Sequence, residues 1–332
     1  MSVLVLFASG LTAAHAAAYG TVGLSLTGPA SVVDEHTITL TVSWTAPDGT
    51  AVPGTVQLWQ HDEGQAWQPA GTLALDATGH GSLSVRPRVD TWYQARGAAG
   101  PDWPAAISPT QYVDNRPPVA PVVLPAKAPR PTALPAQPRA VGAGAAVAVT
   151  PITDAVWNSM VGRSWHQGCP IGRADLRYLQ TNYWGFDGYR HRGELVVRAS
   201  SVGRFTTAMQ RLYAARIRIR SMYLVDRFGY SKRSGGANDF ASMRHDNTSA
   251  FNCRWVTGWR GVRSPHAYGR SIDIDPFENP FHSHAGWLPD AWWTRHSAPY
   301  AWRSSKHRVV RIMRSAGFRW SYPRSDPQHF DA

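Results

Sequence analysis

Ser264-Pro-His-Ala-Tyr-Gly-Arg-Ser-Ile-Asp-Ile-Asp-Pro276 is the stretch around which the second half of the chain is organised. It places the imidazole of His266 and the carboxylate of Asp273 seven residues apart, across a turn that contains glycine. Asp273 lies between two isoleucines, and a strand that buries both isoleucines can hold Asp273 rigidly on its other face. Zinc accepts imidazole and carboxylate ligands, so the stretch predicts half of a metal site.

A third ligand should lie far along the chain, and Asp326-Pro-Gln-His-Phe330 supplies a second imidazole at His329. Three protein ligands of nitrogen and oxygen type leave one position of zinc open, which is the layout of a catalytic site. Spacing alone leaves another interpretation open. In it, His266 and Asp273 form a hydrogen bond near a turn, and His329 is unrelated to them.

The composition is that of a globular protein with a large positive charge. The 332 residues suffice for two domains with separate cores, and 43% of them are hydrophobic. Arginine carries most of the net charge of +12, which favours anionic partners such as an anionic cell-wall polymer. The many arginines have a second possible explanation, because a genome of high GC content favours arginine codons. No recognised nucleic-acid motif accompanies the charge, so we do not expect nucleic-acid binding.

The first residues suggest export. An apolar run over residues 3–14 precedes Ala14-His-Ala16, a small-x-small cleavage pattern, so we predict a signal peptide over residues 1–16 although a positive leading region is missing. No other segment is long and apolar enough for an integral membrane span. We therefore expect a secreted, cell-wall-associated protein. The two cysteines, Cys169 and Cys253, then suggest a disulfide, the alternative being two buried free thiols.

Residues 20–113 show the pattern of an all-β domain. Apolar residues alternate with Thr and Ser from Ile38 to Trp44, and short apolar runs with turn signals between them follow at residues 56–58, 73–75, 83–85 and 92–96. This pattern predicts a β-sandwich. Trp67 and Asp76-Ala-Thr-Gly79 resemble the immunoglobulin-like domains of secreted proteins, which implies a binding or spacer module.

Residues 114–150 are rich in Pro and Ala, and we expect a semi-rigid polyproline II linker without a core. Residues 151–332 hold most of the polar chemistry. Here we expect a helix from Ser201, a strand over residues 222–225, a helix capped by Ser305 and ended by Gly317, and a strand over residues 318–320. Because helices and strands alternate unevenly, the fold class of this domain is α+β.

Several motifs of this second domain resemble one family. Ser264-x-His266-x-x-Gly269-x-x-Ile272-Asp273-Ile274-x-Pro276, Asn279-Pro280 and Asp326-x-x-His329-Phe330 are similar to the zinc D-alanyl-D-alanine carboxypeptidases and L-alanyl-D-glutamate endopeptidases, which are VanY-like enzymes with the hedgehog/DD-peptidase fold. Ser164-Trp-His-x-Gly-Cys-Pro170, Gly193-Glu-Leu-Val-Val197 and Asp246-Asn-Thr-Ser-Ala-Phe-Asn-Cys-Arg254 resemble an extracellular branch of that family. The resemblance covers most of residues 155–332 and implies an antiparallel sheet with helices.

By this resemblance, His266, Asp273 and His329 hold Zn²⁺, and Asp326 is the general base. The implied reaction is hydrolysis of an amide bond in peptidoglycan stem peptides by water activated at the metal. Asp326 would take the proton of that water and later protonate the leaving amine. Loss of one of these four residues would point to the alternative, a non-catalytic wall-binding protein with the same fold. All four are present.

Other residues have implied roles around this centre. Arg254 is expected to stabilise developing negative charge, or to hold a substrate carboxylate, or to form a structural salt bridge. Asp246 could orient Arg254. Ser264 and Tyr268 flank the first ligand and are expected to touch substrate. The family cysteines fall at Cys169 and Cys253, which implies that these two form the disulfide.

The chain also departs from the family pattern. Asp275 replaces a common Asn, which adds a negative charge near the expected metal. Residues 320–325 replace an expected Trp-Gly-Gly-x-Trp-like segment, so substrate specificity is open. Residues 281–304, rich in Trp, His and Arg, have no assigned role.

Overall fold

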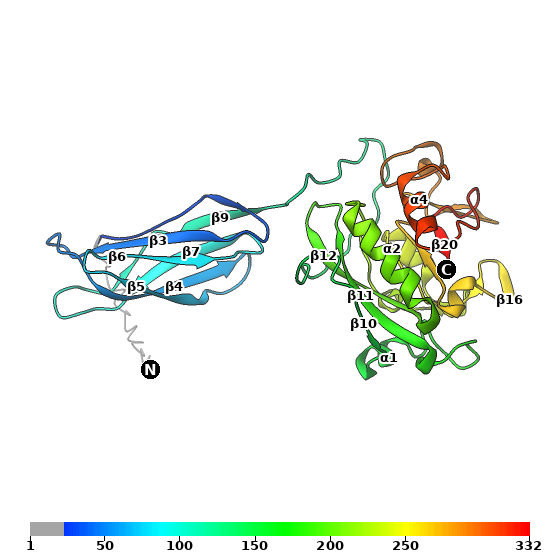
Figure 1. Cartoon of the computed structure of the whole chain (residues 1–332), viewed down its shortest axis with the longest axis horizontal. Helices are drawn as coiled ribbons and strands as arrows, with labels where there is room; N and C mark the ends of the chain where they lie inside the picture. The colour runs from blue at the N-terminus through cyan, green and yellow to red at the C-terminus, as the bar shows by residue number, and fades with distance from the viewer. Residues whose placement is uncertain (1–22) are drawn as a thin grey trace, which may run out of the picture. The chain divides into compact units, whose positions relative to one another are not determined.

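The computed structural model describes residues 23–332, so the predicted signal peptide lies outside the described residues. The chain forms two compact units, of which the first ends at Arg116 and the second comprises Pro117–Ala332 (Figure 1). No helix within residues 23–332 has the length and apolar character needed to cross a membrane.

The first unit consists of two β-sheets. One has the order β1-β3-β6 and is antiparallel. The other has the order β2-β9-β7-β4-β5, in which only β2 and β9 are parallel, and β8 adds to β7. The strands are β1 (Gly23–Thr27), β2 (Ser31–Val33), β3 (Ile38–Thr45), β4 (Gly54–Asp62), β5 (Gln68–Leu75), β6 (His80–Val85), β7 (Thr91–Gly97), β8 (Ala106–Ile107) and β9 (Gln111–Arg116).

Both sheets contribute to one core. Leu40, Val42 and Trp44 of β3 are buried, as the period-two pattern predicts, and they share a cluster with Val56 and Leu58 of β4. The structure therefore has strands where the sequence predicts them, and residues of both sheets share this core. Its immunoglobulin-like character stays a prediction.

The segment after Arg116 differs from the predicted free linker. Its backbone pairs with the second unit, for example from Val122 N to Phe186 O (2.7 Å) and from Ala140 N to Arg190 O (3.0 Å). It ends in β10 (Ala148–Pro151), which pairs with β11 (Leu176–Trp184). The extended backbone that Pro favours leaves the remaining N–H groups free to bond along a neighbouring segment. Residues 117–150 therefore form a docked strap of the second unit.

The second unit is α+β, as predicted. Its main sheet is antiparallel, in the order β10-β11-β12, with β12 at Arg190–Arg198. The other elements are α1 (Asp154–Met160), η1 (Arg173–Asp175), η2 (Ala199–Ser201), α2 (Val202–Ala214), η3 (Val225–Phe228), β13 (Tyr230–Ser231), β14 (Gly236–Ala237), α3 (Asp239–Arg244), β15 (Trp255–Val256), β16 (Trp259–Arg263), η4 (Pro265–Tyr268), β17 (Ser271–Asp273), β18 (Phe281–Ser283), β19 (Gly286–Leu288), η5 (Trp292–Arg295), α4 (Arg308–Ser315) and β20 (His329–Asp331).

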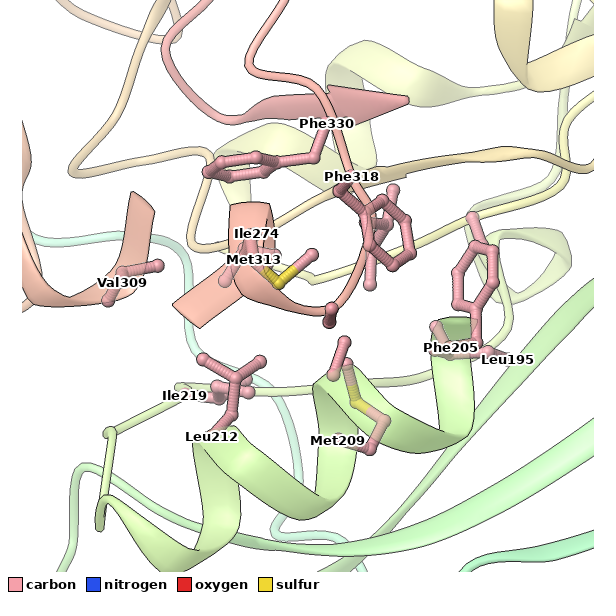
Figure 2. Close-up of a cluster of buried hydrophobic side chains, with 14 of the residues drawn as sticks. Leu195, Phe205, Met209, Leu212, Ile219, Ile274, Val309, Met313, Phe318 and Phe330 are labelled. Atoms are coloured by element: carbon pink, nitrogen blue, oxygen red, sulfur yellow. The ribbon is translucent and has the colours of Figure 1, made fainter. Parts of the chain in front are cut away.

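A hydrophobic cluster joins the helices to the strands that carry polar motifs (Figure 2). Phe205 and Met209 of α2 and Met313 of α4 are almost inaccessible to solvent. Ile274, which follows β17, and Phe330 of β20 belong to the same cluster. The core therefore holds β17 and β20 in place through the apolar neighbours of Asp273 and His329.

Three predicted elements are wrong in detail. Residues 222–225 form no strand, because side chains and loops satisfy this backbone, with Met222 N donating to Gln137 Oε1 (2.7 Å). His307, instead of Ser305, caps α4 by accepting from Val309 N (3.3 Å). Residues 318–320 contribute only one bridge, from Arg319 to Asp331.

Candidate metal centre

A short 3₁₀ turn presents the first predicted ligand. Ser264 caps η4, and its Oγ accepts from the backbone nitrogen of His266 (3.4 Å). Gly269 ends the turn with a φ of 63°, a left-handed conformation that favours glycine. A Cβ at Gly269 would lie 2.9 Å from the backbone nitrogen of Arg198, so close packing also requires glycine.

The strand pair β17–β20 presents the other two predicted ligands. The strands are antiparallel, and Asp273 lies opposite His329 in their register. Directly opposed residues of an antiparallel pair project to the same face with their Cβ atoms close together. The pairing therefore brings the carboxylate and the imidazole together although they are far apart in the chain.

The three side chains converge on one buried point. His266 Nε2 lies 3.0 Å from His329 Nδ1 and 3.1 Å from Asp273 Oδ2, and His329 Nδ1 lies 2.9 Å from Asp273 Oδ1. None of the three residues is more than 4% exposed. Among the described residues they form a group of N and O atoms of the size that holds a metal ion.

The outer hydrogen bonds determine which ring nitrogens are free. His266 Nδ1 lies 2.5 Å from the carbonyl oxygen of Ala250, and His329 Nε2 lies 2.9 Å from Asp331 Oδ1. Both oxygens only accept, so these nitrogens carry the protons and His266 Nε2 and His329 Nδ1 present lone pairs. Asp331 is itself held by the hydroxyls of Ser271 (2.6 Å) and Ser321 (2.5 Å).

Two nitrogen lone pairs and a carboxylate thus face one another without a proton donor between them in these tautomers. Such a set fits a divalent cation, and the outer hydrogen bonds are those that orient metal-binding imidazoles. Burial alone would lower the pKa of His329, but hydrogen bonds to Asp273 and Asp331 raise it well above its ordinary value. The centre therefore favours positive charge, whether as a proton or as a metal ion.

A cavity of about 210 Å³ opens from these ligands, and Asp326 lies in its wall. Asp326 Oδ1 is buried and has no hydrogen-bond partner among residues 23–332. Burial and the neighbouring carboxylate of Asp273 raise the pKa of Asp326 to about 7. A carboxylate with a free oxygen and this pKa can accept and return a proton near neutral pH.

Arg254 also lines the cavity. One guanidinium nitrogen of Arg254 forms a salt bridge with Asp239 Oδ2 (2.8 Å). Asp239 is the first residue of α3, so this salt bridge links Arg254 to that helix. Nε of Arg254 is buried and has no partner within the described part of the chain. Asp246 does not orient Arg254, because it binds Arg220 Nε instead (2.7 Å).

The two residues predicted to touch substrate separate in the structure. Ser264 lines the cavity, whereas Tyr268 is not among its lining residues. Tyr268 packs against a second hydrophobic cluster that includes Ala267 and Cys253. Its side chain contributes to that packing instead of the cavity wall, and its contact with substrate stays a prediction.

The predicted disulfide is present between Cys169 and Cys253, across 84 residues. Cys253 N also donates to Ser164 O (2.8 Å), and the ring of His166 contacts Cys253 O (3.0 Å). The bridge therefore fixes the backbone immediately before Arg254, which reaches the cavity.

Asp275, the departure from the family pattern, does not line the cavity. Its Oδ1 accepts from Arg220 N (3.1 Å), and the side chain of Arg220 joins Asp246 and Glu278 in a buried group. Burial and the carboxylate of Asp246 raise the pKa of Asp275 well above its ordinary value. Asp275 therefore favours its neutral form and lies beside Arg220, outside the wall of the cavity.

Three residues at the centre were not predicted from the sequence. Gln328 lines the cavity with a buried Oε1 that lacks a partner among the described residues, and Asp239 lines it beside Arg254. Asp331 holds the ring of His329. The signal for Asp331 was its position two residues after His329, on the same face of a strand. Asp239 carried no such signal, because only the tertiary structure brings α3 to the cavity.

Comparison with known proteins agrees with this centre. Residues 257–332 match a family model described as D-alanyl-D-alanine carboxypeptidase. The matched region contains His266, Asp273, Asp326 and His329, and it excludes Arg254. No curated protein matches the chain. The family match supports a peptidase, that is, a hydrolase related to peptidoglycan.

Proposed function

We propose that the chain is a secreted zinc peptidase that hydrolyses an amide bond in peptidoglycan stem peptides, of the D-alanyl-D-alanine or the L-alanyl-D-glutamate type. One observation carries the proposal. The lone pairs of His266 and His329 and the carboxylate of Asp273 converge without a donor between them, at the base of a cavity that Asp326 shares.

His266, Asp273 and His329 would hold Zn²⁺. When bound there, zinc would lower the pKa of water and polarise a carbonyl. Ala250 O and Asp331 keep the two imidazoles in the tautomers that leave the inner nitrogens free.

Asp326 would act as the proton carrier. Its unpartnered Oδ1 accepts a proton from the attacking water as the new C–O bond forms. The same oxygen returns that proton to the amine as the C–N bond breaks. The raised pKa of Asp326, about 7, suits both steps, because neither direction of transfer is strongly uphill near neutral pH.

Arg254 would supply positive charge at the cavity. Its guanidinium is held by Asp239 and by the carbonyl of Trp255 (3.2 Å), which leaves little freedom for reorientation. A fixed donor near a carbonyl that gains negative charge stabilises the transition state without reorganisation. The same guanidinium would bind the terminal carboxylate of a stem peptide.

Digestion of purified peptidoglycan tests this function. We expect new fragments by mass spectrometry, loss of these fragments with a chelator, and their return with added zinc. The masses would identify the bond. Asp326→Asn is the matched control, because it keeps the size of the side chain and removes the base. Wall binding without fragments would support the non-catalytic alternative and contradict the peptidase.

A further inference from the structure

One segment near the end of the described chain carries many positive charges and no acidic residue. Seven lysines and arginines lie between Trp302 and Asp326, and this stretch has no Asp or Glu. It includes α4, shown in orange-red in Figure 1, and the loop that leads to β20. Surface arginines usually alternate with acids that compensate them, and no acid within this segment does so.

Four of these cations line a single depression, which we call the basic hollow. It has a volume of about 530 Å³ and is lined by Arg303, Arg314, Arg319 and Arg324, with two serines beside them and no carboxylate. None of the four arginines forms an ion pair with any residue from 23 to 332. Their mutual repulsion would be relieved by an anion.

Arg303 is fixed in place before any ligand binds. Its terminal nitrogens donate to the carbonyl oxygens of Glu278 (2.8 Å), Trp293 (2.5 Å) and Trp302 (2.5 Å). All of these acceptors are uncharged carbonyl groups. Burial lowers the pKa of Arg303 to about 10, although the carboxylate of Asp290 partly opposes this shift.

The basic hollow continues into a second depression of about 220 Å³. Arg303, Pro323 and Arg324 line both, and Trp287 and Thr294 belong to the second. A depression with this extension suits a chain with several charges better than a single small anion. The guanidinium fork also matches phosphate oxygens geometrically.

One loop separates the basic hollow from the metal centre. Tyr322, Ser325 and Asp326 line the catalytic cavity, whereas Pro323 and Arg324 of the same loop line the hollow. A polymer in the hollow would therefore lie directly beside the bond-cleaving site.

We propose that the basic hollow binds the phosphate groups of an anionic polymer attached to peptidoglycan, and so holds the metal centre on polymer-bearing wall. Anion binding rests on the hollow alone, whereas the assignment of the polymer to the wall rests on the proposed function. A nucleic acid is the less suitable polyanion, because single strands are bound by rows of aromatic side chains and Trp320 is the one aromatic side chain beside Phe318 in the hollow.

The test measures binding of the full-length chain to three probes with equal numbers of charges. These are a synthetic poly(glycerol phosphate), a poly-L-glutamate and an oligothymidylate, each titrated at several salt concentrations. We expect the poly(glycerol phosphate) to bind tightest. Arg314→Gln combined with Arg319→Gln should weaken it roughly tenfold and reduce the slope of log Kd against log salt by about two.

Arg163→Gln combined with Arg233→Gln is the control. These arginines are exposed in the same unit, do not line the hollow, and carry the same total charge. Equal weakening by both double variants, or no weakening by either, would overturn the proposal. Tighter binding of the oligothymidylate or of polyglutamate would also overturn it, in favour of nucleic acid or of carboxylates.

The chain with Asp326→Asn separates this proposal from the proposed function. It should bind poly(glycerol phosphate) as the wild type does, because Asp326 does not line the hollow. If the wild type binds the polymer but releases no wall peptides, the proposed peptidase function is overturned and the proposal of phosphate binding is kept. If the wild type cleaves the wall but the variants of the basic hollow bind the polymer normally, the proposal of polymer binding is overturned and the peptidase function is kept.

Discussion

Asp273 and His329 face each other across the β17–β20 ladder, with His329 Nδ1 2.9 Å from Asp273 Oδ1, although 56 residues separate them. This relationship makes a metal centre out of two remote motifs. Its rigidity comes from the core behind the strands, where Ile272, Ile274 and Phe330 are fully buried. A ligand pair held this way needs little reorganisation to bind a cation.

Removal of the first ligand should abolish metal binding. His266→Ala leaves only Asp273 and His329, and two ligands do not hold zinc in a catalytic layout. We expect zinc measured by mass spectrometry to fall from about one equivalent per chain to near zero. His282→Ala is the control, because His282 is exposed and outside the centre. Equal zinc in both variants would sink the ligand assignment.

Asp331→Asn should weaken zinc binding without removing a ligand. Asp331 accepts from His329 Nε2 and thereby raises the basicity of the ring at its inner nitrogen. We expect a loss of affinity of about 10- to 100-fold in competition with a chromogenic chelator. Ser321→Ala keeps the contact with His329 and should have a smaller effect. An unchanged affinity in Asp331→Asn would show that the contact does not tune the ring.

The ionisation of Asp326 should determine how activity falls at low pH. A base works only when deprotonated, so kcat/KM should fall as the pH drops through the pKa of Asp326. Burial raises that pKa to about 7, and a bound cation would lower it. The pH at which kcat/KM falls to half should therefore lie between the ordinary pKa of 3.8 and about 7. Asp326→Asn should reduce kcat/KM by about 100-fold or more while zinc content stays constant. An unaltered rate would remove Asp326 from the mechanism.

Gly269→Ala should destabilise the second unit and disturb the turn that carries His266. A left-handed φ costs an alanine about 1–2 kcal/mol, and its Cβ would lie 2.9 Å from Arg198 N. We expect a lower free energy of unfolding in denaturant and weaker zinc binding. Gly203→Ala, in α2 and without neighbours within 4 Å, should instead stabilise the helix by up to about 1 kcal/mol. Similar effects of the two variants would contradict this account.

Gln137→Ala should destabilise the second unit although it lies in the Pro-rich segment. Gln137 Oε1 accepts from Met222 N (2.7 Å) and from the hydroxyl of Tyr183 (2.6 Å), and its Nε2 donates to Met222 O (2.9 Å). The loss of buried partners should cost about 2–4 kcal/mol in the free energy of unfolding. Gln210→Ala, exposed on α2, should change it by less than about 0.5 kcal/mol. Equal stability of both variants would show that the strap is not anchored there.

Local patterns predicted the strands of the first unit and the α2 helix correctly. Alternation from Ile38 to Trp44 and the apolar stripe through Phe205, Met209 and Leu212 are properties of single elements that bury one face. The docked strap could not be predicted this way. Its hydrogen bonds end on residues far along the chain, such as Phe186 and Met222, and Pro-rich composition is equally compatible with a free spacer.

The sequence by itself determined the chemistry of the centre. The run around His266 and Asp273 and the distant Asp326-x-x-His329 carry the ligand types, the base and the glycine that their turn requires. Only the tertiary structure decided that these groups converge, which oxygens orient the imidazoles, and that Tyr268 faces a hydrophobic cluster instead of the cavity. The physical reason is that side-chain type is a local property, whereas distances between remote side chains depend on strand register and core packing.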